Sequence, residues 1–446
     1  MTEQLLHYCW KHRLFPLTQL ATTDGQLVEV IDTGLHNSDA GPDFINAKIK
    51  LADTVWVGNV EIHNKSSDWY AHHHDQDTNY NNVVLHVSGD VDTPVRTTTG
   101  REIPQLELQV PQQVEQQYEQ LLMADAYPPC HEVVSEMPRI TVHAWLSALQ
   151  TERLEQKTLQ IKQRLALCQG DWETVLFVTL ARNFGFGVNG DAFEQWAMHI
   201  PLHSVAHHRD DLFQVEAFFM GQAGLLERSL IPEKYHATMD TEGYFERLQN
   251  EYLYLQHKFN LQPMEGKRWK FLRLRPQNFP NIRIAQLATL YHSHRFGLRN
   301  LVESESLKAL KDTMKSGVST YWQTHYVFGA VSKKSEKRIS ESSLNVLLIN
   351  TVIPILFAYG RYHDEEELCD KALNYLEQLQ PETNHIVRKW QESGIKVENA
   401  GDTQALVQLQ RQYCERKECL RCRFGYEYLK GCLLYTSDAA DDIALV

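Results

Sequence analysis

The sequence predicts an α+β protein in which an N-terminal α/β part, residues 1–125, precedes a mostly α-helical region, residues 126–431. Two observations carry this prediction. Between residues 26 and 63 apolar and polar residues alternate, as in strands with one buried face. From about Ile140 onward apolar residues recur at helical spacing among charged ones. The expected join is the segment 112–138, which contains Pro128, Pro129 and Pro138.

The elements of the N-terminal part follow in chain order. Residues 4–14 carry an apolar stripe at helical spacing, and residues 26–33 alternate as a first strand. The runs 46–51 and 54–63 predict two further strands, and the short break between them predicts a hairpin. Ser67 and Asp68 favour a helix start, because their side chains accept hydrogen bonds from the free amides of a first turn. Residues 83–87 predict a fourth strand.

Two acidic residues fall where adjacent strands can bring them to one cation. Asp43 ends the segment Gly41-Pro42-Asp43, just before the start of one predicted strand, and Glu61 lies near the end of the next strand. Since side chains of a strand alternate between faces, Glu61, His63 and Lys65 are expected on the same side. The simpler alternative is that Asp43 caps a turn while Glu61 forms a surface ion pair.

This order of elements resembles the PD-(D/E)xK nuclease superfamily, whose core runs helix, three strands, helix, strand. The resemblance implies a restriction-endonuclease-like α/β core that hydrolyses DNA or RNA phosphodiesters. It also implies that Asp43, Glu61 and the Ile62 carbonyl hold Mg²⁺ or Mn²⁺. The sequence departs from the motif at His63, where the superfamily carries Lys, and Lys65 is the nearest replacement. A neutral imidazole supplies no fixed positive charge, so the departure bears on catalysis more than on fold.

A second polar cluster follows directly along the chain. It consists of imidazoles and carboxylates within twenty residues: Asp68, His72, His74, Asp75 and His86. Imidazole binds Zn²⁺, Mn²⁺ or Fe²⁺ well, and a carboxylate completes such a shell. The alternative is a solvated polar helix, with His86 hydrogen-bonded in the core.

Three cysteines near the end of the chain have the spacing Cys414-x4-Cys419-x2-Cys422. Such a set can wrap one zinc ion or an iron–sulfur cluster if a fourth ligand is present, and Cys130 and Cys369 are the candidates. The alternative is a set of reduced thiols on a helix and its turn. The final segment, residues 432–446, resembles a translated sequencing adapter and is excluded from the ligand search.

Beyond these motifs, the chain is similar to the family called domain of unknown function 2851. The similarity covers nearly the whole chain, through the motifs around Asp43 and Glu61, the segment Arg275–Pro280, the segment Leu347–Thr351 and the late cysteines. Membership implies a bacterial cytoplasmic protein, and it supports the fold and the site rather than a reaction.

The net charge and the hydropathy pattern limit the kinds of partner that the protein is expected to bind. The formal net charge of −13 argues against a general nucleic-acid binder. One local segment is basic and bears aromatic residues, and it is the expected contact for DNA or RNA: Lys267, Arg268, Lys270, Arg273 and Arg275. The apolar run 346–359 is interrupted by Asn350 and Pro354, which favours a buried helix and no membrane partner. A cytoplasmic chain with reduced thiols is expected, and the sequence identifies no protein partner.

Three functions follow as hypotheses. The preferred one is a metal-dependent nuclease-like enzyme acting through Asp43, Glu61 and His63. The second is a non-catalytic nucleic-acid-binding or scaffold protein that has kept a nuclease-like fold. The third is a His-rich metallohydrolase of small molecules.

Overall fold

The computed structural model describes residues 2–15, 20–37, 39–124 and 128–430. They belong to two compact units, the first formed by 1–142, 388–395 and 409–446, and the second by 143–387 and 396–408. The division therefore falls near residue 142 rather than at the predicted residue 125. The late cysteines belong to the first unit, although the sequence placed them in the helical region. The segment 432–446, predicted to be adapter-derived, lies outside the described residues.

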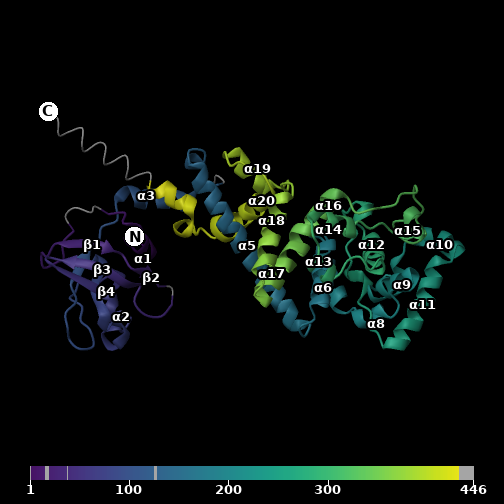
Figure 1. The fold of residues 1–446 in the computed structure, drawn as a ribbon, viewed down its shortest axis with the longest axis horizontal. Helices are drawn as coiled ribbons and strands as arrows, with labels where there is room; N and C mark the ends of the chain where they lie inside the picture. The colour runs from purple at the N-terminus through teal and green to yellow at the C-terminus, as the bar shows by residue number, and fades with distance from the viewer. Residues whose placement is uncertain (1, 16–19, 38, 125–127, 431–446) are drawn as a thin grey trace. The chain divides into compact units, whose positions relative to one another are not determined.

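The first unit is built on one mixed sheet (Figure 1). Its early elements are α1 (Glu3–His12), β1 (Val28–Asp32), β2 (Leu35–His36), β3 (Phe44–Leu51), β4 (Thr54–Lys65), α2 (Asp68–Ala71), β5 (Val83–Asp90) and β6 (Gln105–Glu107). The strand order is β1-β3-β4-β5-β6, with β2 also paired to β3. Strands β1, β3 and β4 are antiparallel neighbours, whereas β4, β5 and β6 run parallel. The two strands and the hairpin predicted between residues 46 and 63 are confirmed.

Strand β4 is covered on both faces only in its second half. Its residues 54–57 are exposed, whereas residues 60–63 are buried. On one face Val60 and Ile62 pack with Leu6 and Trp10 of α1. The opposite face lies toward a smaller cluster centred on Trp69, which is fully buried. Because successive side chains alternate between faces, Glu61 and His63 project away from the α1 side of the sheet.

The remaining elements of the first unit are helical and include α3 (Gln112–Met123), α4 (His131–Val134), a π-helical turn (Leu409–Cys414) and a 3₁₀ turn (Cys419–Arg421). Helices α5 (Arg139–Leu167) and α19 (His385–Glu392) each extend across a boundary between the units.

The second unit is all helical in its described residues, as the periodicity predicts. Its principal helices are α6 (Trp172–Phe184), α7 (Gly190–Met198), α8 (Leu202–Ala206), α9 (Leu212–Gln222), α10 (His236–Glu242), α11 (Tyr244–Phe259), α12 (Pro280–His292), α13 (Leu298–Val302), α14 (Leu307–Met314), α15 (Thr320–Thr324), α16 (Glu341–Leu347), α17 (Ile353–His363), α18 (Glu366–Gln378) and α20 (Ala400–Gln408). They enclose one large apolar core.

The apolar run 346–359 belongs to a longer helix than the sequence indicates. A π-helical turn, Leu348–Val352, joins α16 to α17, so Pro354 enters without ending the helix. Asn350 donates its side-chain amide to the Val346 carbonyl and also remains inside the helix. The continuous helix Glu341–His363 is long and apolar enough to cross a membrane by length and composition, yet 72% of its most apolar window is buried. It is accounted for as a core helix.

Candidate metal centre

Asp43 and Glu61 are brought together by the pairing of β3 with β4. The backbone N–H of Asp43 donates to Glu61 Oε2 at 3.0 Å, and the backbone N–H of Ile62 donates to Asp43 Oδ2 at 2.9 Å. This reciprocal pair bridges the two strands beside the register shift between Phe44 and Ala47. Among the described residues, no hydrogen bond reaches Oδ1 of Asp43. That oxygen is therefore available to a ligand.

The other oxygen of Glu61 faces imidazoles. Glu61 Oε1 lies 3.3 Å from His74 Nε2 and 3.7 Å from His63 Nε2. The Glu61 side chain is 6% exposed and that of His63 is 2% exposed. The simpler reading of Glu61, a surface ion pair, is therefore wrong. The two carboxylate oxygens of Glu61 therefore have different partners: Oε2 accepts from the backbone of Asp43, and Oε1 faces His63 and His74.

Three imidazoles form the tightest set of ligand atoms at the site. One nitrogen each from His63, His72 and His74 lies within 4.8 Å of the other two. His63 Nε2 is 3.2 Å from His72 Nδ1, and the rings of His63 and His74 stack with centroids 5.3 Å apart. These three residues come from β4 and from the turns around α2, so their proximity depends on the fold. In the described part of the chain this is the group whose spacing suits a metal ion.

The imidazoles are held in place by a layer of aromatic residues. His63 Nδ1 is hydrogen-bonded to His86 Nε2 at 2.9 Å, which leaves His63 Nε2 directed at the site. His74 stacks on the ring of Tyr80 with centroids 3.8 Å apart. Trp69 packs edge-on against His74 and His86. Such support from behind is typical of imidazoles that bind metals, because it fixes both the ring orientation and the tautomer.

Burial sets the protonation of these groups. Desolvation, followed by the charge of Asp43, raises the pKa of Glu61 to about 9. Desolvation and the neighbouring imidazoles lower the pKa of His63 to about 2, and desolvation together with His74 lowers that of His86 to about 3. Near neutral pH Glu61 is therefore protonated while His63 and His86 are neutral, so the contacts of Glu61 with His63 and His74 are not ion pairs. Neutral imidazole is the form that binds metals.

The remaining residues predicted for this region lie away from the centre. Lys65 is 59% exposed and pairs with Asp90 at 3.5 Å, so it does not take the place of the missing Lys. The side chain of Asp68 accepts the backbone N–H of Lys65 at 3.1 Å and caps the turn. Asp75 lies in a 3₁₀ turn beside His74, and its charge acts to raise the pKa of that imidazole. The fully buried stretch of β4 ends at His63, and Lys65 lies beyond it.

One residue of the site was missed by sequence reasoning. His7 of α1 places Nε2 3.3 Å from Asp43 Oδ2 and 3.4 Å from the Ile62 carbonyl oxygen. Burial lowers the pKa of His7, but the hydrogen bond and charge of Asp43 outweigh it, and the net pKa is raised. The only signal in the sequence was a polar residue inside the apolar stripe of residues 4–14.

The four cysteines of the second predicted site line one small cavity. Cys130, Cys414, Cys419 and Cys422 face it together with Trp390, Tyr413 and Leu121. The sulfur of Cys369 lies 3.6 Å from the Phe357 carbonyl oxygen, and Cys369 is not among the described residues that line this cavity. Burial, and then the neighbouring cysteines, raise the pKa of Cys130 and of Cys414.

The basic segment 267–275 is only partly available to a ligand. Its basic residues are exposed: Lys267, Arg268, Lys270, Arg273 and Arg275. Trp269, however, is 5% exposed and donates its indole N–H to the Ala223 carbonyl. One of the aromatic residues of this segment is therefore a core residue.

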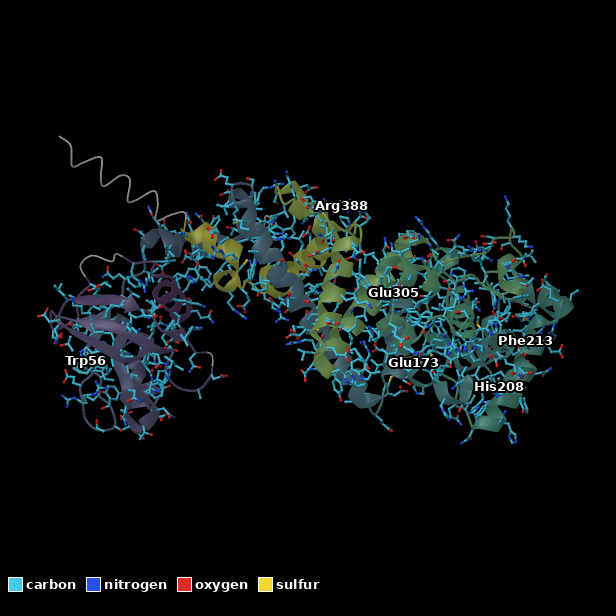
Figure 2. All side chains as sticks on the ribbon, viewed as in Figure 1. Trp56, Glu173, His208, Phe213, Glu305 and Arg388 are labelled. Atoms are coloured by element: carbon cyan, nitrogen blue, oxygen red, sulfur yellow. The ribbon has the colours of Figure 1, made fainter. Side chains whose placement is uncertain are left out.

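The sheet of the first unit offers another surface with an aromatic residue. Trp56 is 48% exposed and is labelled at the surface of this unit in Figure 2. It lines an open groove with polar neighbours from β3, β4, the β4–β5 connection and the β5–β6 connection: Asn46, Asn59, Asn81, Asn82 and Arg101.

Fold and site together define an α+β protein with a helical second unit and a buried carboxylate–imidazole cluster beside a mixed sheet. The family model described as protein of unknown function (DUF2851) matches residues 3–385, and the chain belongs to this family. No curated protein and no solved structure matches the chain.

Proposed function

We propose that the first unit is a metal-dependent, nuclease-like hydrolase of DNA or RNA phosphodiesters. The observation that carries the proposal is the meeting of Asp43 and Glu61 across β3 and β4. The element order α1, β1, β3, β4, α2, β5 supports it, because a helix, three strands, a helix and a strand is the order of the PD-(D/E)xK core. The two-residue strand β2, which pairs with β3, is an addition to that order of elements.

The residues fit a hard divalent cation. Asp43 Oδ1, a Glu61 oxygen and the Ile62 carbonyl would hold Mg²⁺ or Mn²⁺. When bound, such an ion activates water and shields charge on the phosphate. Since Glu61 is protonated near neutral pH, it must release a proton when the cation binds. His63, neutral and oriented by His86, would present Nε2 to the site as a ligand or hydrogen-bond acceptor, because a pKa of about 2 makes it a weak base toward water. Trp56 and the asparagines of its groove offer stacking and amide groups to a nucleotide.

The direct test is cleavage of labelled single- and double-stranded DNA and RNA with Mg²⁺, Mn²⁺ or Zn²⁺. We expect cleavage by the wild type and a loss of about a hundredfold or more in Asp43→Asn and Glu61→Gln. Asp53→Asn, at the exposed hairpin, is the matched control and should cleave like the wild type. If the wild type cleaves nothing and Asp43→Asn changes neither metal nor nucleic-acid binding, the scaffold hypothesis replaces this one.

A second function has its own observation, the imidazole triad. His63, His72 and His74 with Glu61 Oε1 suit Zn²⁺, Mn²⁺ or Fe²⁺ better than Mg²⁺, which supports a metallohydrolase of small molecules. His72→Ala distinguishes the two functions. It should abolish zinc binding if the triad is the metal centre and spare Mg²⁺-dependent cleavage if the carboxylates are. His73→Ala is the matched control, because His73 neighbours the triad in sequence but is not part of it.

We also propose that Cys130, Cys414, Cys419 and Cys422 bind a metal centre, either zinc or an iron–sulfur cluster. Its support is that four thiols from distant parts of the chain face one cavity. Thiolate binding to a metal would offset the cost of burying them. Metal analysis of purified protein tests this. Zinc or iron lost in Cys414→Ser but kept in Cys369→Ser supports the centre, and metal-free protein with all four thiols reactive contradicts it.

A further inference from the structure

A polar cavity in the second unit is lined by basic and neutral residues only. Its walls come from the segment before α12, from α12 itself and from the segment 337–343, which leads into α16. The cationic lining residues are Arg275, Arg283, Lys337 and Arg338. The cavity measures about 610 Å³ including its solvent-filled mouth. Four lining residues are cationic and none is acidic, so the lining carries a strong positive charge.

Two of the four cations are buried. Arg283 is 5% exposed and Lys337 is 4% exposed. Desolvation lowers the pKa of Arg283 to about 10 and that of Lys337 to about 8, so both remain protonated at neutral pH. A buried charge costs several kcal/mol unless an opposite charge or a full set of hydrogen bonds compensates it.

The protein compensates these charges only in part. Arg283 donates to Gln286 Oε1 and Asn278 Oδ1, and it lies over the Phe186 ring. Its Nε–H is buried without a hydrogen-bond partner. Lys337 donates to the Trp322 and His325 carbonyl oxygens. Among the described residues, no carboxylate lies within ion-pair distance of either cation. The ammonium of Lys337 also lies 4.0 Å from the centroid of the Tyr326 ring, so both buried cations are compensated by neutral groups alone.

The mouth of the cavity supplies further donors. Arg275 and Arg338 are exposed there, and Arg338 forms an ion pair with the exposed Glu336. An exposed ion pair of this kind is worth little and is easily exchanged. The hydroxyls of Ser340, Ser342 and Ser343 lie next to each other at the start of α16. Guanidinium groups combined with hydroxyls match the several acceptor oxygens of a phosphate.

We propose that this cavity is a binding site for a phosphate monoester group, held by Arg275, Arg283 and Arg338 with the α16 serines. The proposal does not rest on the proposed nuclease function, because every lining residue belongs to the second unit. The group comes either from a free nucleotide or from the 5′ end of a nucleic acid.

Calorimetric titration of the full chain at low ionic strength tests the proposal. The probes are inorganic phosphate, adenosine 5′-monophosphate, and one oligonucleotide with a 5′-phosphate or a 5′-hydroxyl. We expect saturable binding of phosphate that weakens about tenfold or more in Arg275→Gln with Arg338→Gln, two exposed positions that the fold tolerates. A preference for the monophosphate identifies a nucleotide site, and a preference for the phosphorylated over the hydroxylated oligonucleotide identifies an end-binding site.

The control variant is Arg273→Gln, since Arg273 is exposed on the same segment but does not line the cavity. It removes one positive charge, against two in the double variant, and should change phosphate affinity by less than about twofold. Two results overturn the proposal. One is the absence of saturable phosphate binding to the wild type. The other is an equal loss in Arg273→Gln, which would indicate general charge attraction rather than a site.

Discussion

Replacing Asp43 separates its structural role from its metal-binding role. Its Oδ2 accepts the backbone N–H of Ile62, a residue that is 1% exposed. Asp43→Ala leaves that N–H buried and unpaired, at a cost of about 2 kcal/mol. Asp43→Asn keeps an acceptor oxygen and removes only the charge. The charge change also relieves the repulsion that raises the pKa of Glu61. We therefore expect Asp43→Asn to unfold locally about as readily as the wild type.

Hydrogen exchange of peptides covering β3 and β4 measures this difference locally, which avoids treating two units as one transition. A cost of about 2 kcal/mol corresponds to about thirtyfold faster exchange in Asp43→Ala, against a change below about threefold in Asp43→Asn. Both variants should lose Mn²⁺ binding in a titration, while Asp53→Ala changes neither property. Equal exchange in the two Asp43 variants would refute the bridging role, and Mn²⁺ binding by Asp43→Asn would refute the metal role.

Three further predictions concern other groups. Burial raises the pKa of Glu216 from 4.5 to about 7, so its contribution to stability is complete below pH 4.5 and falls as pH rises through that window, by about 3 kcal/mol in total. Glu216→Gln, which keeps an acceptor for Tyr244 and Ser319, should flatten the pH dependence of urea unfolding monitored in the second unit; an unchanged slope would contradict the shift. Trp69→Ala removes the ring that packs against His74 and His86, and it should destabilise the first unit by about 3 kcal/mol or more. Hydrogen exchange of β5 measures this loss. An effect below about 1 kcal/mol would mean that the imidazoles do not depend on the Trp69 ring. Chelation should accelerate exchange around Cys130 and Cys414 in the wild type only if the four cysteines hold a metal, and identical traces with and without chelator would count against it.

Local patterns in the sequence predicted the strands well. Alternation placed β3 and β4 and the hairpin between them, and side-chain parity put Glu61 and His63 on one face. Lys65 keeps the same parity, but it is exposed and pairs with Asp90 beyond the buried part of the strand. The alternation failed at Ile45 and Asn46, which are both exposed: Asn46 has φ +58°, and the register shifts there.

The local sequence patterns did not predict contacts between distant parts of the chain. Nothing local distinguishes Cys130 from Cys369 as the partner of the late cysteines, and only the fold selects Cys130. His7 joins the site through the packing of α1 on the sheet, which an apolar pattern does not report. The basic segment was predicted as a surface, but its Trp269 is needed in the core of the second unit. In each case the local pattern around the residue fits both a structural and a functional role, and tertiary packing decides between them.

The central claim is that Asp43 and Glu61 share a divalent cation. Crystals of the wild type soaked in Mn²⁺ test it most directly, because anomalous scattering locates the ion. The claim predicts a peak about 2.2 Å from carboxylate oxygens of both Asp43 and Glu61. A peak held by His63, His72 and His74 without Asp43, or no peak in the first unit at a concentration that saturates binding in solution, would contradict it.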